Sequence, residues 1–393
     1  MSVYGIISEF NPFHNGHKYL IDTAKAEGAE AVVCVMSGNA VQRGDISVTD
    51  KYYRAEMALH GGADLVLELP YPWCAAGAEA FAFCGVTIAS SFADKLFFGS
   101  ECGDIALLER AAEIASSGEF IDDYKEQLVG SVGSAEMYFK LLEQRTGQKY
   151  SSNDILGIEY IKAIKKLGVD MGVGTLGRMG GDYLAEDIVG GDIQSATAIR
   201  RSMREGGIET VEKYMPEGAF EVLKRAFDNN EWSDITNLDC AMKLYFRMKS
   251  HEAFGDIADI DDGLATRLCR VARECGAENF LESLSTKRYT DARLRRAALF
   301  AVTGVERKDI DALPEYVNLL AANATGRKLL AKARKESAIT VLAKAADIPR
   351  TDGAARQAEL SDRLDAIFTL ALTNEKPVSH IIKKSPIISG EDK

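Results

Sequence analysis

The sequence predicts an α/β fold with a parallel sheet, followed by a mainly α-helical second domain. In the first 100 residues, near-continuous apolar runs alternate with helical patterns, and such runs are typical of parallel strands that are buried on both faces. Beyond about residue 205, strand patterns fade and helical spacing dominates. Because 393 residues exceed what one simple core needs, we expect an α/β domain in residues 1–205 and a helical domain in residues 206–393.

Four strands are expected early in the chain, each a short apolar run that leads into a polar loop. They are "VYGIIS", "AEAVVCVMSG", "DLVLELP" and "DKLFFGSE", at residues 3–8, 29–38, 64–70 and 94–101. Ligands of parallel α/β sheets bind beyond the carboxyl ends of the strands. The loops after these strands are therefore the first candidates for a binding site.

Helical patterns separate and follow these strands. In order, we expect helices over 16–28 and 49–63, an Ala-rich segment at 74–91, mostly helical residues at 104–168, a fifth strand at 169–177, and helices within 192–206, 290–304 and 363–373. Gly28 is the expected stop of the first helix, and Thr49 and Ser195 are the expected N-caps of two others.

Composition and charge restrict the class of protein. The chain is 46% apolar and 27% charged, as in ordinary soluble proteins, and no apolar run approaches the about 18 residues needed to cross a bilayer. Its seven cysteines are scattered without a CxxC pair, which favours reduced cytoplasmic thiols over disulfides or zinc. The net charge of −12 argues against nonspecific binding of nucleic acid over the whole surface, although a local basic patch remains possible.

The segment "FNPFHNGH" places two histidines three residues apart at a strand-to-helix turn. A helix N-terminus attracts anions through its free N–H groups and its dipole, and Gly16 would let a phosphate approach the backbone closely. His14 and His17 would donate hydrogen bonds to phosphate oxygens, and Lys18 adds a cation. The alternatives are histidines that only cap the turn, or a zinc site that lacks a third ligand. The flanking strand and helix favour the phosphate site.

A second helix start resembles an anion site. In "IQSATAIRRSMR", Ser195 and Thr197 begin a helix and Arg200 follows one turn later. Such caps are common, so this segment gains weight only as a partner of the histidine turn.

Two further loops are weaker candidates. "GNAVQRGD", residues 38–45, suits a polar ligand but equally suits a surface turn with a solvated salt bridge, and Lys51 and Arg54 share a face of the next helix. Gly99 in "FGSECGD" could admit a nucleoside, although a tight turn is the simpler explanation.

Basic residues cluster twice in the second half. "KRYTDARLRR" (287–296) and "RKLLAKARK" (327–335) each hold five basic residues, with one acidic residue in the first and none in the second. Such helix faces fit contacts with RNA phosphates, and a solvated helix face is the alternative for each cluster taken alone.

An ordered set of motifs resembles a known family. "GIISEFNPFHNGH", "MSGNAVQRGD", "GADLVLELP", "FFGSE", "NDILGIEY", "SATAIR" and "TKRYTDARLRR" occur in that order, and together they resemble the bacterial tRNA(Met) cytidine acetate ligase family of the HIGH-motif nucleotidyltransferase superfamily. The resemblance covers essentially the whole chain. It implies a Rossmann-like nucleotidyltransferase domain, with ATP and acetate forming acetyl-adenylate. The acetyl group would then pass to N4 of the wobble cytidine of elongator tRNA(Met).

The resemblance also implies site residues. For ATP these are Ile6, Ile7, Ser8, Glu9, Phe10, Asn11, Pro12, Phe13, His14, Asn15, Gly16, His17, Lys18, Tyr19, Gly99, Asn153 and Arg178. The groups that we expect to act on the phosphates are His14, His17, Lys18, Ser195, Thr197 and Arg200. The residues expected to contact tRNA are Lys287, Arg288, Arg293, Arg295, Arg296, Arg327 and Lys328.

Some points stay open at this level. Asn153-Asp154 stands where relatives often have two asparagines, so either residue could face ATP, and "GTLGRMGGDYLAED" around Arg178 lacks a lysine and a histidine of the family pattern. No protein ligand for a metal is assigned, although triphosphate chemistry usually brings Mg²⁺. A nucleotidyltransferase that acts on a small metabolite and a non-catalytic RNA-binding protein are the alternatives. The length and the basic clusters favour a macromolecular substrate, and the intact histidine turn favours an enzyme.

Overall fold

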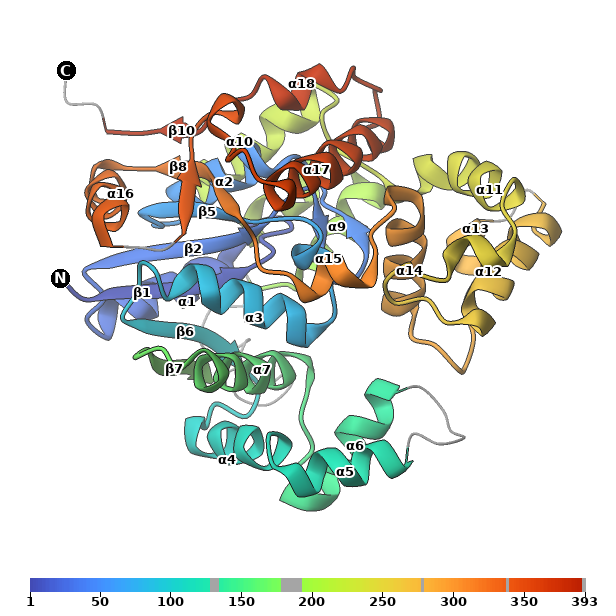
Figure 1. Cartoon of the computed structure of the whole chain (residues 1–393). Coiled ribbons are helices and arrows are strands. Elements are labelled where there is room, and N and C mark those ends of the chain that lie inside the picture. The colour runs from blue at the N-terminus through green and yellow to red at the C-terminus, as the bar shows by residue number, and fades with distance from the viewer. Residues whose placement is uncertain (128–133, 178–192, 277–278, 337–338, 391–393) are drawn as a thin grey trace.

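The computed structural model describes residues 1–127, 134–177, 193–276, 279–336 and 339–390. At its centre lies one sheet with the strand order β10-β8-β5-β2-β1-β6-β7, and β9 pairs with β8 (Figure 1). Strands β5, β2, β1, β6 and β7 are parallel to one another, whereas β8 runs antiparallel to β5. The strands are β1 (Val3–Ser8), β2 (Ala31–Ser37), β5 (Leu65–Leu69), β6 (Lys95–Ser100), β7 (Gly172–Gly177), β8 (Tyr316–Ala322), β9 (Thr340–Leu342) and β10 (Ile387–Ile388); β3 (Ala40–Val41) and β4 (Asp45–Ile46) form a separate hairpin.

Strand alternation divides the apolar core between the two faces of the sheet. Tyr4 and Ile6 belong to one core cluster, and Val3 and Ile7 belong to the other, because successive side chains of a strand point to opposite faces. Both faces are buried under helices, which explains why the strands are almost continuously apolar.

Helices cover both faces. The first core cluster takes in residues of α1 (Asn15–Ala26), α2 (Lys51–His60), α9 (Ala196–Gly206) and α10 (Glu217–Asp228). The second takes in residues of α3 (Ala78–Ala89), α4 (Ile105–Ala115), α7 (Ser152–Leu167), α11 (Asp239–Arg247), α12 (Asp262–Glu274), α14 (Asp291–Thr303) and α17 (Asp352–Ala371). The shorter or peripheral helices are α5 (Gly118–Gln127), α6 (Ser134–Thr146), α13 (Phe280–Ser283), α15 (Arg307–Asp311), α16 (Ala324–Glu336) and α18 (Ser379–Ile382).

The α/β class and the five strands expected up to residue 177 are confirmed. The expected N-cap Thr49 is wrong. The helix begins at Lys51, and Asp50 caps it by accepting hydrogen bonds from the N–H groups of Tyr52 and Tyr53. Thr49 lies in extended backbone that pairs with Trp232, so its backbone belongs to a bridge and not to the helix start.

The second half contributes more to the sheet than its sequence predicted. Strands β8, β9 and β10 come from residues beyond 205 and join the central sheet. The apolar run of β8 is short, and periodicity alone does not distinguish such a run from a buried helical segment. The domain boundary expected near residue 205 stays a prediction.

No helix within the described ranges is both long enough and apolar enough to cross a membrane.

Candidate active site

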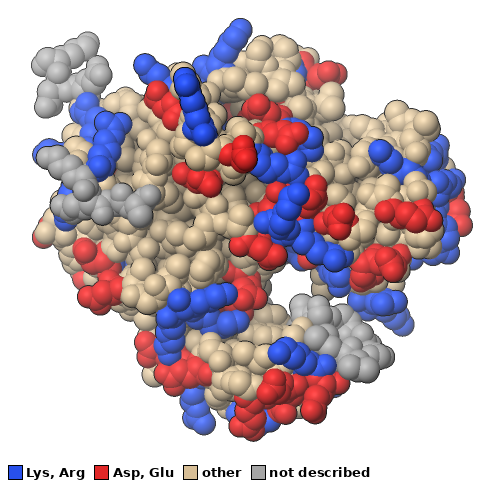
Figure 2. Space-filling view, in the orientation of Figure 1, with Lys and Arg blue, Asp and Glu red and all other residues tan. Residues whose placement is uncertain are grey.

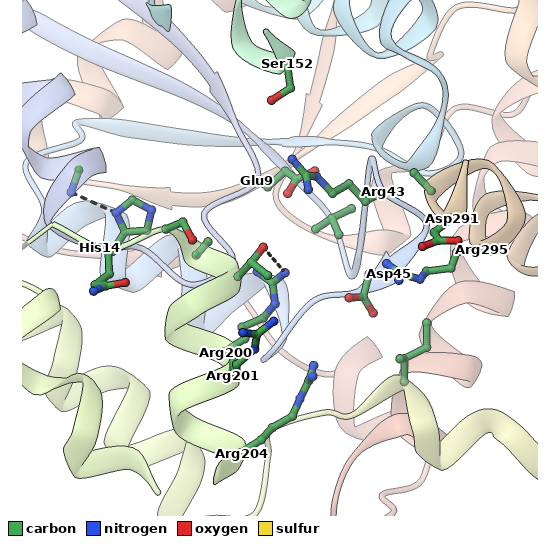
Figure 3. Close-up of a pocket in the computed structure, with 18 of the residues that line it drawn as sticks. Glu9, His14, Arg43, Asp45, Ser152, Arg200, Arg201, Arg204, Asp291 and Arg295 are labelled. Atoms are coloured by element: carbon green, nitrogen blue, oxygen red, sulfur yellow. Dashed lines mark hydrogen bonds between the residues drawn. The ribbon is translucent and has the colours of Figure 1, made fainter. Parts of the chain in front are cut away.

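A cavity of about 1260 Å³ opens at the carboxyl edge of the parallel strands. Strand order reverses between β1 and β6, because the chain continues to β2 and β5 on one side and to β7 on the other. Such a switch point is where α/β sheets bind ligands. The cavity is lined by the loop after β1, the hairpin β3–β4, the end of β7, the start of α9, and residues of α13 and α14 (Figure 3). Residues from both halves of the chain therefore enclose one space.

The histidine turn is the N-terminus of α1. His14 is the N-cap, and its Nδ1 accepts a hydrogen bond from the N–H of Gly16 at 3.0 Å, while Nδ1 of His17 accepts one from the N–H of His14 at 3.3 Å. The two rings stack, with centroids 3.8 Å apart. When Nδ1 of a neutral histidine accepts a hydrogen bond, the proton is on Nε2, which then is a donor. Both histidines line the cavity, so the turn has the donors that a phosphate site needs.

Glycine at position 16 and aromatic packing shape this turn. A Cβ on Gly16 would lie 2.9 Å from Cε1 of the His14 ring. The rings of Phe10 and Phe13 are fully buried and lie 4.8 and 5.5 Å from the His17 ring. Gly61 makes room for Phe13, since a Cβ there would lie 2.0 Å from that ring. The two buried phenylalanine rings therefore fix the position of the His17 ring by packing against it.

Within the predicted ATP segment 6–19, the residues that line the cavity are Glu9, His14, Gly16, His17 and Tyr19. Ile6, Ile7, Phe10, Asn11, Pro12 and Phe13 are buried. Asn11 is structural: its Oδ1 accepts a hydrogen bond from the N–H of Val48 at 2.7 Å. The Lys18 ammonium lies 2.7 Å from Asp22 on the exposed side of α1, so the structure does not bring it into the cavity.

The second helix N-terminus lies in the same cavity. Ser195 caps α9 by accepting a hydrogen bond from the N–H of Ala198 at 3.2 Å, and Thr197 and Arg200 line the cavity beside it. Arg200 donates to the backbone carbonyl of Asn11 at 2.6 Å, which ties α9 to the first loop. Burial lowers the pKa of Arg200, against the attraction of Asp45 and Glu9. The structure thus brings together two segments that lie about 180 residues apart in the sequence.

Hydrogen bonding and burial distinguish Asn153 from Asp154. Asn153 lines the cavity and donates to Oε1 of Glu101 at 2.6 Å. Asp154 is buried and accepts hydrogen bonds from Oγ of Ser100 and the N–H of Cys102, so it is structural. Gly99 is paired within β6 and β7 and is not among the residues that line the cavity. Arg178 lies outside the described residues.

The predicted RNA-contacting residues of the first basic cluster, 287–296, separate into three groups. Arg295 lines the cavity. Arg293 and Arg296 pair with Asp261 and Asp259, at 3.2 and 2.6 Å, and so hold the start of α14 to the preceding loop. Lys287 and Arg288 are exposed.

Arg327 and Lys328 lie at the other edge of the sheet. They belong to α16, whose start is fixed by Asn323, which donates to the carbonyl of Asp64 at 3.0 Å. Asp64 directly precedes β5, so α16 begins at the amino edge of the parallel strands, opposite the cavity.

The sequence prediction omitted cavity residues that the structure reveals. Arg201 and Arg204 line the cavity, and Arg204 pairs with Asp234 at 3.2 Å; Arg43, from the loop 38–45 that the sequence offered as a weaker candidate, lines it too. The spacing of Arg200, Arg201 and Arg204 on one short helix was the available signal. Lys and Arg side chains gather along the junction between the sheet and the helices on the right of Figure 2, interspersed with acidic side chains. Among the described residues there is no group of three or more His, Cys, Asp or Glu that could hold a metal ion.

The sheet, its switch point and the histidine turn together define a nucleotidyltransferase of the HIGH type, and the family model HIGH Nucleotidyl Transferase matches residues 1–381. A tRNA(Met) cytidine acetate ligase of Caldanaerobacter subterraneus subsp. tengcongensis is 32% identical over 391 residues, covering 95% of this chain and 96% of the relative. One from Clostridium perfringens is 35% identical over 370 residues, covering 88% and 90%.

A solved structure of similar sequence agrees with these relatives. Thermotoga maritima TmcAL bound with alpha-thio ATP superposes with a TM-score of 0.89 at 31% identity, covering 99% of both chains. The chain belongs to the tRNA(Met) cytidine acetate ligase family.

Proposed function

We propose that this chain activates acetate with ATP and transfers the acetyl group to N4 of the wobble cytidine of elongator tRNA(Met). The observation that carries this proposal is the meeting of two helix N-termini and Arg200 in one cavity at the switch point. The ligase activity of the relatives and the ATP analogue in the Thermotoga structure support it.

In the first step, acetate attacks the α-phosphate of ATP and diphosphate leaves. We assign His14 and His17 to the α-phosphate, because each ring presents an Nε2–H donor from a helix N-terminus. Ser195, Thr197 and Arg200 are assigned to the leaving diphosphate, since they line the same cavity at a second helix N-terminus. Asn153 lines the cavity after β6 and completes the set of ATP contacts that we propose.

Mg²⁺ fits this site only as an ion that enters with the nucleotide. The described residues offer no cluster of three ligands, whereas Mg²⁺ in phosphate-transfer sites keeps several waters and is held by substrate phosphates with only one or two carboxylates. Such an ion would neutralise phosphate charge. We assign no protein ligand to it.

In the second step, the wobble cytidine enters from the side of α13 and α14. Arg295 faces the cavity from α14, and Arg201 and Arg204 face it from α9. We propose that these arginines contact the RNA backbone, because guanidinium groups bind phosphates in bidentate geometry. The division into an α/β domain and a helical, RNA-contacting domain remains part of this proposal, as does the cytoplasmic location expected from the cysteines.

The test incubates the protein with ATP, labelled acetate and bulk tRNA. We expect the label to appear in N4-acetylcytidine of the tRNA. The double variant His14→Ala, His17→Ala should lower acetate-dependent release of diphosphate by about 10²-fold or more, the usual cost of removing donors to a developing charge. His251→Ala removes an exposed histidine of the helical half and is the matched control.

Two results would contradict these assignments. Failure of the wild-type protein to label tRNA would exclude the ligase activity. Full activity of the double histidine variant would exclude the assigned phosphate site but leave the ligase activity in place.

A further inference from the structure

Glu9 belongs to the predicted ATP segment and lines the cavity, but the phosphate steps proposed above assign no role to its carboxylate. It directly follows β1, at the switch point of the sheet, and lies five residues before His14. A carboxylate does not bind phosphate, and the attacking acetate is itself an anion. Its presence beside the phosphate-binding donors therefore calls for a partner with hydrogen-bond donors or a proton to release.

The position of Glu9 is fixed from two sides. Its Oε1 accepts a hydrogen bond from the backbone N–H of Gln42 at 3.0 Å, and its carbonyl accepts one from the buried Arg54 guanidinium at 2.8 Å. Within the described part of the chain, no hydrogen bond to its Oε2 is found. One oxygen is thus anchored, and the carboxylate still lines the cavity.

Other carboxylates of the cavity are either engaged or exposed: Asp45 accepts a hydrogen bond from the N–H of Ile46 at 2.9 Å, and Glu205 is exposed. Glu101 accepts hydrogen bonds from Asn153 and Ser151, and Asp234 pairs with Arg204. Asp291 accepts one from Ser285, and Glu282 is exposed on α13. In Figure 3, Glu9 lies between His14 on one side and Asp291 and Arg295 on the other. This is the region where an activated acetyl group and an incoming base would meet.

The second step, acetyl transfer to the cytidine, needs a group that accepts a hydrogen bond and a proton from N4. The N4 amine of cytosine donates hydrogen bonds, and carboxylates are its usual acceptors in proteins. The amine is a weak nucleophile, because its lone pair is conjugated with the ring, so a base must take a proton as the C–N bond forms.

We propose that Glu9 binds N4 of the wobble cytidine and is the general base of acetyl transfer. This inference rests on the proposed function. N4 forms a bond to the acetyl carbon, the bond from that carbon to the phosphate oxygen breaks, and AMP leaves with the electron pair. The N4 proton passes to Oε2 of Glu9 and is then released to solvent. Glu9 is thus a catalytic residue of the second step only.

Burial supports this role, because it raises the pKa of Glu9 above the usual 4.5, against the attraction of Arg200 and Arg43. A carboxylate of higher pKa is a stronger base. The charged and titratable groups that act on Glu9 from the surrounding elements are Arg43, Asp45, Arg54, Tyr160 and Arg200.

The experiment separates the two steps in Glu9→Gln, whose amide oxygen keeps the hydrogen bond from Gln42. Acetate-dependent release of diphosphate should fall much less than acetyl transfer does. Single-turnover transfer to tRNA(Met) from preformed acetyl-adenylate should fall about 10²-fold or more, the usual contribution of a general base. In the wild type this transfer rate should fall as the pH is lowered through the raised pKa of Glu9, and in Glu9→Gln that dependence should vanish. Glu9→Asp should be slower than wild type but keep the dependence, and Glu109→Gln, an exposed glutamate of α4 that does not line the cavity, is the matched control.

Other outcomes overturn the inference. An equal loss of both steps would place Glu9 in acetate activation. A weaker affinity for tRNA with an unchanged transfer rate and an unchanged pH profile would make it a binding residue only. A wild-type protein that forms acetyl-adenylate without modifying tRNA would overturn the proposed function itself, and this result is distinguishable because it appears before any variant is tested.

Discussion

At the scale of single residues, Arg54 shows how the floor of the cavity is held together. Its guanidinium is fully buried and donates to the carbonyls of Glu9, Ser37 and Gly38, while its Nε donates to the carbonyl of Thr49. These carbonyls belong to the ends of β1 and β2 and to the segment before α2. Burial lowers the pKa of Arg54 to about 10, so it is still charged at neutral pH. One side chain therefore fixes three chain segments.

We expect Arg54→Met to lower the free energy of unfolding by about 3 kcal/mol or more, because each buried carbonyl left without a donor costs about 1–3 kcal/mol. Urea denaturation monitored by circular dichroism measures this change. Arg334→Met removes an exposed arginine of α16 and should change stability by less than about 0.5 kcal/mol. Equal stability of the two variants would show that Arg54 is dispensable for the fold.

At the scale of elements, a buried polar network joins α2, α17 and the loop after β2. Asn39 donates to Asp365 on α17 at 2.7 Å and accepts from the N–H of Lys51 at 2.8 Å. The Lys51 ammonium pairs with Glu68 on β5 at 2.9 Å. Lys51 and Arg54 share a helix face as the sequence indicated, but both are buried in structural roles and neither lines the cavity.

The network makes stability depend on pH. Burial raises the pKa of Asp365 to about 6, although Lys51 opposes this shift. Because the unfolded chain releases this proton near pH 4, the folded state binds more protons between about pH 4 and pH 6. Stability therefore falls as the pH rises through that window.

Asp365→Asn should remove this pH-dependent loss of stability, because the asparagine cannot ionise. Its amide oxygen still provides an acceptor for Asn39. We expect a gain of about 3 kcal/mol at pH 7 and none at pH 4, from about 2 pH units at 1.4 kcal/mol each. Urea denaturation at both values measures it, and Asp352→Asn at the exposed start of α17 controls for the loss of one negative charge. A gain that is equal at both pH values would contradict the role of burial.

At the scale of the whole molecule, the sheet has a cavity at one edge and the basic start of α16 at the other. Arg201 and Arg295 line the cavity from the two halves of the chain. Arg327 and Lys328 lie at the amino edge, beside Asp64. The two basic clusters have the same number of basic residues in the sequence, but in the structure they lie at opposite edges of the sheet.

Arg201→Ala, Arg295→Ala should weaken tRNA(Met) binding and lower the salt dependence of the affinity by about one unit of slope per arginine. Filter binding at several salt concentrations measures both quantities. We expect a smaller effect from Arg327→Ala, Lys328→Ala. A larger effect from the α16 pair would place the RNA on the opposite edge of the sheet.

Local signals explain how much could be predicted. The strands up to residue 177 and the cap Ser195 follow from apolar runs and cap chemistry that need only neighbouring residues. Strand β8 was missed because a short apolar run has no local mark of its partner, and β5 lies about 250 residues earlier. The pairing of Arg293 and Arg296 with Asp261 and Asp259 was missed for the same reason.

Periodicity, capping and ordered motifs are local properties of the chain, and they were sufficient to predict the class of fold, the two helix N-termini and the resemblance to the ligase family. Which of these parts meet became evident only in the folded chain. It brought His14 and Ser195 to one cavity, assigned Asn153 and not Asp154 to its wall, and separated Arg295 from Arg327. The physical reason is that burial and hydrogen-bond partners depend on contacts between residues far apart in the sequence, and these exist only when the sheet has assembled.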